Sequence, residues 1–98
     1  MKSKRTKALD ISQATRETVY NRDNGRCIFC HSHGIPNAHF IPRSDSGLGI
    51  SQNIITACKG CHYDLDMTIR RKEMLQIARK HLDRFYPDFT DEMRRYKK

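Results

Sequence analysis

The pattern of apolar and polar positions near the start of the chain predicts one amphipathic helix. Apolar residues recur at helical spacing between Ile11 and Val19. Ser12 is a good N-cap residue, and the Asp-Asn-Gly sequence at 23–25 is a typical helix stop. We therefore expect a helix that begins after Ser12 and ends at this stop.

The centre of the chain has the pattern of two short strands joined by a loop. Residues 38–41 predict the first strand, and the Pro-, Ser- and Gly-rich residues 42–51 predict the loop. The sequence Asn-Ile-Ile-Thr-Ala at 53–57 is β-branched and predicts the returning strand. A helix is expected at or just after Cys61.

The last third of the chain predicts a second amphipathic helix between Met67 and Tyr86. Its apolar residues are spaced by three or four, and its basic residues occupy other positions, which indicates a basic outer face. Pro87 ends this helix, and Thr90 is expected to cap a last short helix through Met93. With no internal repeat or boundary, residues 1–98 read as one domain.

Charge changes this picture by indicating a polyanionic partner. The 98 residues carry 19 Lys and Arg against 11 Asp and Glu, a formal net charge of +8, which nucleic acid would neutralise most simply. Residues 1–10 are basic with little apolar content, so we expect a flexible arm able to contact phosphates. An anionic membrane surface is the main competitor, but no apolar run is long enough to span a bilayer.

Four cysteines form two C-x-x-C pairs, at Cys27 and Cys30 and at Cys58 and Cys61. The N-terminus lacks the apolar segment of a signal peptide, so we expect a reducing cytoplasm, where such pairs are metal ligands more often than disulfides. Four thiolates complete the tetrahedral coordination of a structural zinc ion and leave no position for catalytic water. A redox dithiol is the alternative, without the βαβ context typical of that motif.

The two cysteine pairs occur together with the sequences Ala38-His39-Phe40-Ile41-Pro42-Arg43-Ser44, Gly47-Leu48-Gly49, Asn53, and His62 with Asp66. Together these residues resemble the HNH endonucleases, whose catalytic core is the ββα-metal finger. The similarity extends to the leading helix that ends at residues 22–23 and to the Phe-Tyr-Pro tail at 85–87, as in small phage and prophage members.

The resemblance implies an α+β fold in which a zinc-stapled ββα-metal core at 27–66 has helices on both sides, with a helical C-terminal extension at 67–98. It also implies a role for each residue of the motif. His39 would be the general base that activates water. Asn53 would hydrogen-bond across the loop and hold His39 in place. His62, with Asp66 one helical turn later, would bind a divalent cation at the phosphate.

One position departs from the family pattern. The residue before the first histidine is often a metal ligand in the family, but here it is Ala38, which has no ligating atom. Either His62 and Asp66 hold the cation together with water and phosphate, or another side chain such as Asp64 takes part. Mg²⁺ or Mn²⁺ would suit such an open site, and Ni²⁺ would suit the imidazole.

Other basic side chains are candidates for phosphate contacts, and three histidines are not expected in the site. The candidates are Arg43, just after the first strand, and Arg70, Arg71 and Lys72. Nothing resembles a device for reading bases, so sequence specificity is expected to be weak or to come from a partner. We expect His31 and His33 to be exposed or to touch phosphate, and His81 to lie on the surface.

The sequence thus predicts a metal-dependent DNA endonuclease that leaves 5′-phosphate and 3′-hydroxyl ends, as the resemblance implies. By analogy with similar phage proteins, it would act in the bacterial host cytoplasm beside the large terminase subunit, as a monomer or weak dimer. The main alternative is a zinc-stapled nucleic-acid-binding module without catalysis, favoured by Ala38. A weaker alternative is a zinc adaptor that binds only protein.

Overall fold

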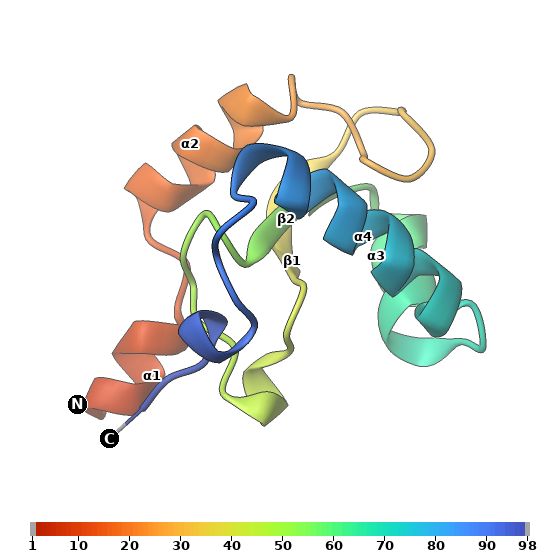
Figure 1. The fold of residues 1–98 in the computed structure, drawn as a ribbon. Coiled ribbons are helices and arrows are strands. Elements are labelled where there is room, and N and C mark those ends of the chain that lie inside the picture. The colour runs from red at the N-terminus through yellow and green to blue at the C-terminus, as the bar shows by residue number, and fades with distance from the viewer. Residues whose placement is uncertain (1, 98) are drawn as a thin grey trace.

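Helices cover a two-stranded antiparallel sheet, so the protein has an α+β fold. The computed structural model describes residues 2–97 (Figure 1). Met1 of the expected arm and Lys98 of the expected C-terminal extension lie outside this range. The helices, strands and 3-10 helices follow in the order α1 Lys4–Leu9, α2 Gln13–Arg22, β1 Ile35–His39, η1 Arg43–Asp45, β2 Ile54–Ala57, α3 Lys59–Met67, α4 Arg71–Phe85 and η2 Glu92–Arg94.

The sheet pairs β1 with β2 in the centre of the molecule. Ile35 faces Ala57, Ala38 faces Ile55 and His39 faces Ile54, with a register irregularity between Ile35 and Ala38. The two strands were expected at 38–41 and 53–57. The first strand begins three residues earlier than expected, at Ile35, and it ends at His39, where the chain leaves the sheet to enter the loop.

Helix α2 begins and ends at the residues that the sequence predicts. The Ser12 hydroxyl accepts a hydrogen bond from the amide of Thr15 at 3.1 Å and so caps the first turn. At the other end, Asn24 and Gly25 adopt positive φ angles of 57° and 66°, a left-handed conformation that stops the helix. Figure 1 shows α2 on one side of the sheet and the α3–α4 pair on the other.

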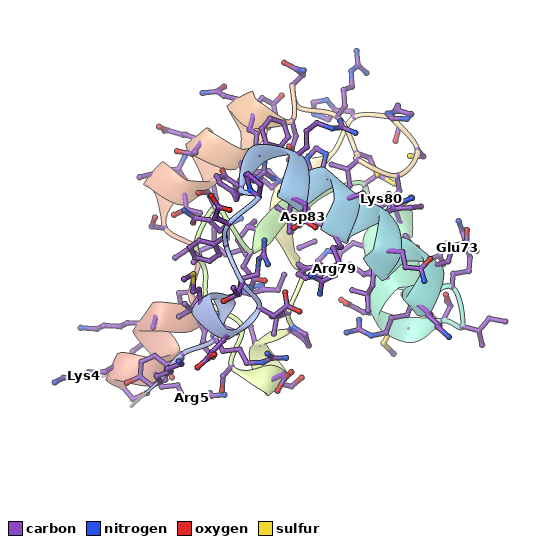
Figure 2. The ribbon with its side chains drawn as sticks, in the orientation of Figure 1. Lys4, Arg5, Glu73, Arg79, Lys80 and Asp83 are labelled. Atoms are coloured by element: carbon purple, nitrogen blue, oxygen red, sulfur yellow. The ribbon has the colours of Figure 1, made fainter. Side chains whose placement is uncertain are left out.

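The expected amphipathic helix is divided between α3 and α4. Met67 belongs to the end of α3, and α4 begins at Arg71 after a short break. Met74, Ala78 and Leu82 recur every four residues on α4 and are fully buried, while the basic side chains lie on its other faces. Lys80 and Glu73 project outward from α4 in Figure 2. The buried face completes a core with Ala38, Ile55 and Leu65.

Residues 4–9 form the short helix α1, where the composition predicts a flexible arm. The Ser3 side chain caps α1 by accepting from the amide of Thr6, and the side chain of Leu9 is buried. The hydrophobic effect of burying Leu9 explains why this basic segment packs on the domain. None of the helices in residues 2–97 is long and apolar enough to cross a membrane.

The chain near both ends docks on the loop between the strands. The amide of Gly49 donates to the carbonyl of Ala8 at 3.0 Å, and the amide of Tyr96 donates to the carbonyl of Ser46 at 2.8 Å. Thr90 accepts from the amide of Met93 just before η2, which lies where a last short helix is expected. The loop after β1 is therefore held from two sides.

Candidate functional site

The four cysteines meet at one point beside the sheet. All four sulfur atoms lie within 4.8 Å of one another, and Sγ of Cys30 is 3.7 Å from Sγ of Cys58 on the other pair. A tetrahedral zinc ion with bonds of about 2.3 Å places its sulfurs about 3.8 Å apart. The cluster therefore has the donor set and the spacing to hold a metal ion such as zinc.

The local electrostatics of the cysteine cluster also suit a cation. Hydrogen bonds from Ser32 lower the pKa of Cys30 to about 6, so a thiolate is present there at neutral pH. Burial and the neighbouring sulfurs raise the pKa of Cys61 well above its ordinary value. A metal ion at the centre would remove the repulsion between neighbouring thiolates, because its charge stabilises all of them together.

A groove of about 930 Å³ lies on the side of the molecule where β1 ends. Its wall is formed by residues that flank α1, by helices α2, α3 and α4, by β1 and by the loop after β1. The lining includes the predicted residues His39, Arg43, His62, Asp66 and Arg71, together with residues Lys2, Asp10, Ile11, Arg16, Asn37, Pro42 and Ser44. The structure thus brings most of the candidate residues to one concave surface that is rich in cationic side chains.

His39 is the last residue of β1, and one of its ring nitrogens is already engaged. Its Nε2 lies 2.9 Å from the carbonyl oxygen of Leu9, which can only accept a hydrogen bond. Nε2 therefore carries the proton, and Nδ1 of the neutral ring keeps a free lone pair. Burial lowers the pKa of His39 more than the bond to Leu9 raises it, so the ring is neutral near pH 7.

Asn53 is fully buried and ties the loop after β1 to the start of β2. Its Oδ1 accepts from the amide of Ile41 at 2.9 Å, and its Nδ2 donates to the carbonyls of Ile41 at 3.1 Å and Leu48 at 2.9 Å. The side chain does bond across the loop, as predicted. Its bonds fix the backbone two residues beyond His39, while the direct hydrogen bond to the His39 ring comes from Leu9.

His62 and Asp66 face each other one turn apart on α3. Nε2 of His62 is 3.2 Å from Oδ2 of Asp66, at the i, i+4 spacing of neighbours on one helix face. This separation suits an ion pair, and it is also close to the roughly 3.0 Å between adjacent ligands of an octahedral cation with bonds of about 2.1 Å. The arrangement offers one nitrogen and one carboxylate to the groove.

Residues 38 and 64, the two other positions discussed as sites for a ligand of the catalytic cation, do not line the groove. Ala38 is fully buried in the core opposite Ile55, so its side chain faces away from solvent. Asp64 pairs with Arg70 at 3.0 Å and does not line the groove. Asn37, two residues before His39, does line it, and its Oδ1 is buried without a hydrogen-bond partner.

The predicted phosphate contacts separate into two groups. Arg43 and Arg71 line the groove, whereas Arg70 and Lys72 do not. Arg43 donates to the carbonyl of Leu9 and pairs with Asp10, both at 2.9 Å. Arg71 donates to the carbonyl of Leu65 at 3.0 Å. Both side chains remain partly exposed, so each keeps donors available to an anion in the groove.

The three other histidines give a mixed result. His31 and His33 are exposed, as expected. The prediction that His81 lies on the surface is wrong, because its ring is only 17% exposed and Nε2 lies 2.7 Å from Oδ1 of Asp23. The amphipathic pattern of α4 did not reveal this pairing, because the partner lies 58 residues away in the chain.

The sequence interpretation also missed the residues that α1 and α2 bring to the groove. Leu9 contacts His39 through its backbone carbonyl, which every residue type has, so the residue type did not indicate this contact. Asp10, Arg16 and Lys2 belong to segments read as a basic arm and a packing helix. A basic stretch interrupted by Leu9 and Asp10 was the only available signal that this segment folds onto the site.

Comparison with known proteins adds no assignment. No protein-family model matches the chain, and no curated protein matches it either. The functional argument therefore depends on the chemistry of the groove and of the cysteine cluster.

Proposed function

We propose that the protein is a metal-dependent endonuclease of the HNH type that cleaves phosphodiester bonds in DNA. One observation carries the proposal: a neutral histidine with a free Nδ1, a His-carboxylate pair and several cations line the same groove. Together these groups can hydrolyse a phosphodiester, because they supply a base for water, a cation site and positive charge around the phosphate.

The proposed base is His39. Its Nε2 proton is bound to the Leu9 carbonyl, so Nδ1 is the atom that takes a proton from water as the oxygen attacks phosphorus. The depressed pKa keeps this nitrogen unprotonated near neutral pH. Asn53 serves as a positioning residue, because it fixes the loop that continues from His39.

The proposed site for a catalytic Mg²⁺, Mn²⁺ or Ni²⁺ ion consists of His62 and Asp66. When bound, the ion would neutralise a non-bridging phosphate oxygen and stabilise the leaving 3′-oxygen. Arg43 and Arg71 bind neighbouring phosphates from the groove wall, so the attacked phosphate is held while His39 acts. Products with 5′-phosphate and 3′-hydroxyl ends follow from breaking the bond to the 3′-oxygen.

The cysteine cluster is proposed to hold a structural zinc ion in a ββα-metal core. Cys27 and Cys30 precede β1, while Cys58 caps α3 directly after β2 and Cys61 lies in the first turn of α3. Zinc bound by these four residues fixes α3, and with it His62 and Asp66, relative to His39 at the end of β1. It plays no part in the chemistry, because four thiolates complete its coordination.

DNA is the proposed substrate and a large terminase subunit the proposed partner in a bacterial cytoplasm. The net charge of +8 supports a polyanion, and the groove supports contact with phosphates more than with bases. One domain offers one base, so a monomer is expected to nick one strand at a time. The terminase partnership is extended from the resemblance to small phage proteins.

A non-catalytic zinc module that binds nucleic acid is the second candidate. The burial of Ala38 favours it, because a ligand that the family often supplies at this position is absent. Both candidates predict DNA binding that weakens with salt, so binding does not separate them.

Plasmid nicking separates the two candidates. The zinc-loaded protein is incubated with supercoiled plasmid and Mg²⁺, Mn²⁺, Ni²⁺ or added Zn²⁺, with EDTA as the chelator control. The nuclease proposal expects conversion to the open-circular form with at least one of these ions and none with EDTA. Retained DNA binding without conversion under any ion would instead establish the binding module.

A further inference from the structure

The backbone of residues 8–10 lies directly against the candidate base. The carbonyl of Leu9 accepts hydrogen bonds from Nε2 of His39 and from Nη1 of Arg43, each at 2.9 Å. The next residue, Asp10, pairs with Nη2 of the same Arg43 at 2.9 Å. One peptide unit therefore orients two groups of the groove that belong to β1 and η1.

Gly49 determines how closely this peptide can approach. Its amide donates to the carbonyl of Ala8 at 3.0 Å. A Cβ atom at this position would lie 2.0 Å from the carbonyl oxygen of Asp10 and 2.9 Å from that of Leu9. Because non-bonded contacts this short do not occur, any side chain on residue 49 would force the Leu9–Asp10 backbone and the loop at residue 49 apart.

The contact made by Gly49 is with backbone atoms, which cannot rotate away as a flexible side chain could. The displacement would therefore be transmitted to the Leu9 carbonyl. A hydrogen bond weakens steeply beyond its normal range, so a shift of this carbonyl would break or bend the bond to His39. Asn53 holds the other side of the same loop through the carbonyl of Leu48.

We propose that Gly49 is a positioning residue of this site, and that it acts through the Leu9–Asp10 peptide on the ring of His39. The close packing of Gly49 places the Leu9 carbonyl where it holds the Nε2 proton, so Nδ1 keeps its lone pair free. The catalytic consequence rests on the proposed nuclease function, whereas the orientation of His39 does not.

Several charged groups surround His39 and would also affect its titration. Arg43 on η1 and His62 on α3 disfavour the protonated ring, and Asp66 on α3 favours it. Lys2, Asp10, Arg16 on α2 and Arg71 on α4 line the same groove. The substitution of Gly49 removes none of these charges, but it displaces Asp10 and its partner Arg43 together with the Leu9 carbonyl. The exchange of the Nε2 proton depends on the Leu9 bond itself, so it is the readout specific to this bond.

The test compares Gly49→Ala with Gly60→Ala in the full zinc-loaded protein. Gly60 is a matched control, because a Cβ on it would meet nothing within 4 Å. Zinc content and circular dichroism report the fold. Long-range ¹H–¹⁵N NMR identifies the nitrogen of His39 that carries the proton and measures the solvent exchange of that proton. Plasmid nicking is measured on the same samples over a range of pH.

We expect wild type and Gly60→Ala to show a slowly exchanging Nε2 proton on His39, and Gly49→Ala to lose this protection. With folded Gly49→Ala, kcat for nicking should fall about 100-fold with little change in KM, as expected for a misplaced base.

A rapidly exchanging Nε2 proton, or a proton on Nδ1, in the wild-type protein would overturn the proposal even if Gly49→Ala failed to fold. Folded Gly49→Ala with wild-type protection of the Nε2 proton of His39 would also overturn it. If the NMR results hold but the wild type does not nick DNA, the nuclease function is wrong and the positioning role of Gly49 stands.

Discussion

Oδ1 of Asp23 lies 2.7 Å from Nε2 of His81, and this contact joins the end of α2 to the middle of α4. The same carboxylate accepts from Arg22 at 2.8 Å and from the backbone amide of Thr56 on β2 at 3.1 Å. Asp23 is only 7% exposed. One buried carboxylate therefore connects both helices with the sheet that carries the site.

Replacement of Asp23 by Asn is expected to destabilise the protein by about 3 to 5 kcal/mol at pH 7, because it leaves the buried Arg22 without its counter-charge. Burial raises the pKa of Asp23, but the hydrogen bonds from His81 and Arg22 lower it by a larger amount. The pKa of Asp23 is therefore well below its usual value. Because the pKa of Asp23 is lower in the folded protein, its ionised carboxylate stabilises the fold at pH values above its unfolded pKa of about 4. This stabilisation is lost as the pH falls from that value toward the pKa of the folded state.

Urea unfolding between pH 7 and pH 3 measures this contribution. The difference in unfolding free energy between wild type and Asp23→Asn should narrow below about pH 4. Asp45→Asn is the control, because Asp45 pairs with Arg95 in an exposed position and should change stability by less than about 1 kcal/mol. A constant difference across the pH range would contradict this interpretation of Asp23.

Removal of the metal from the cysteine cluster is expected to unfold the domain. The cluster connects two segments that are 28 residues apart, and a chain of 98 residues has little core to compensate for its loss. The measurement is circular dichroism with zinc analysis before and after chelation, and one zinc per chain is expected. Zinc-free protein that keeps its full helical signal would contradict a structural role for the metal.

Local chemistry explains which parts of the fold were predictable from the sequence. Ser12 and the residues 23–25 that stop the helix define α2 through bonds within a few residues, and the spacing of each C-x-x-C pair lets its two sulfurs share one metal ion. The break between α3 and α4 was missed because Met67 continues the apolar pattern. Helix α1 was missed because its stability depends on burying Leu9 against the rest of the domain.

The candidate site shows the same division. His39, His62 and Asp66 were proposed as site residues from residue type and spacing, and they line one groove. The hydrogen bond from His39 to the Leu9 carbonyl could not be inferred, because every residue has a carbonyl and this one lies 30 residues away. The pairing of Asp23 with His81 was hidden for the same reason, since tertiary packing alone brings the two together.

Arg71 and its neighbour Lys72 should differ in their contribution to DNA binding. Arg71 lines the groove, whereas Lys72 is exposed on α4 outside it. Arg71→Gln is therefore expected to reduce the slope of log affinity against log salt concentration by about 0.9, the value for one phosphate contact, and Lys72→Gln should leave it unchanged. Fluorescence anisotropy with a short duplex measures both slopes. Equal slopes for the two variants would mean that the groove is not the binding surface.

The nuclease mechanism depends most directly on His39. The decisive measurement is the rate of Mg²⁺- or Mn²⁺-dependent plasmid nicking by wild type, His39→Ala and the control His33→Ala, in which an exposed histidine outside the groove is removed. Loss of the general base should lower the rate of His39→Ala by at least about 100-fold, with zinc content and circular dichroism unchanged, while His33→Ala retains wild-type activity. Undiminished nicking by folded His39→Ala would contradict the account.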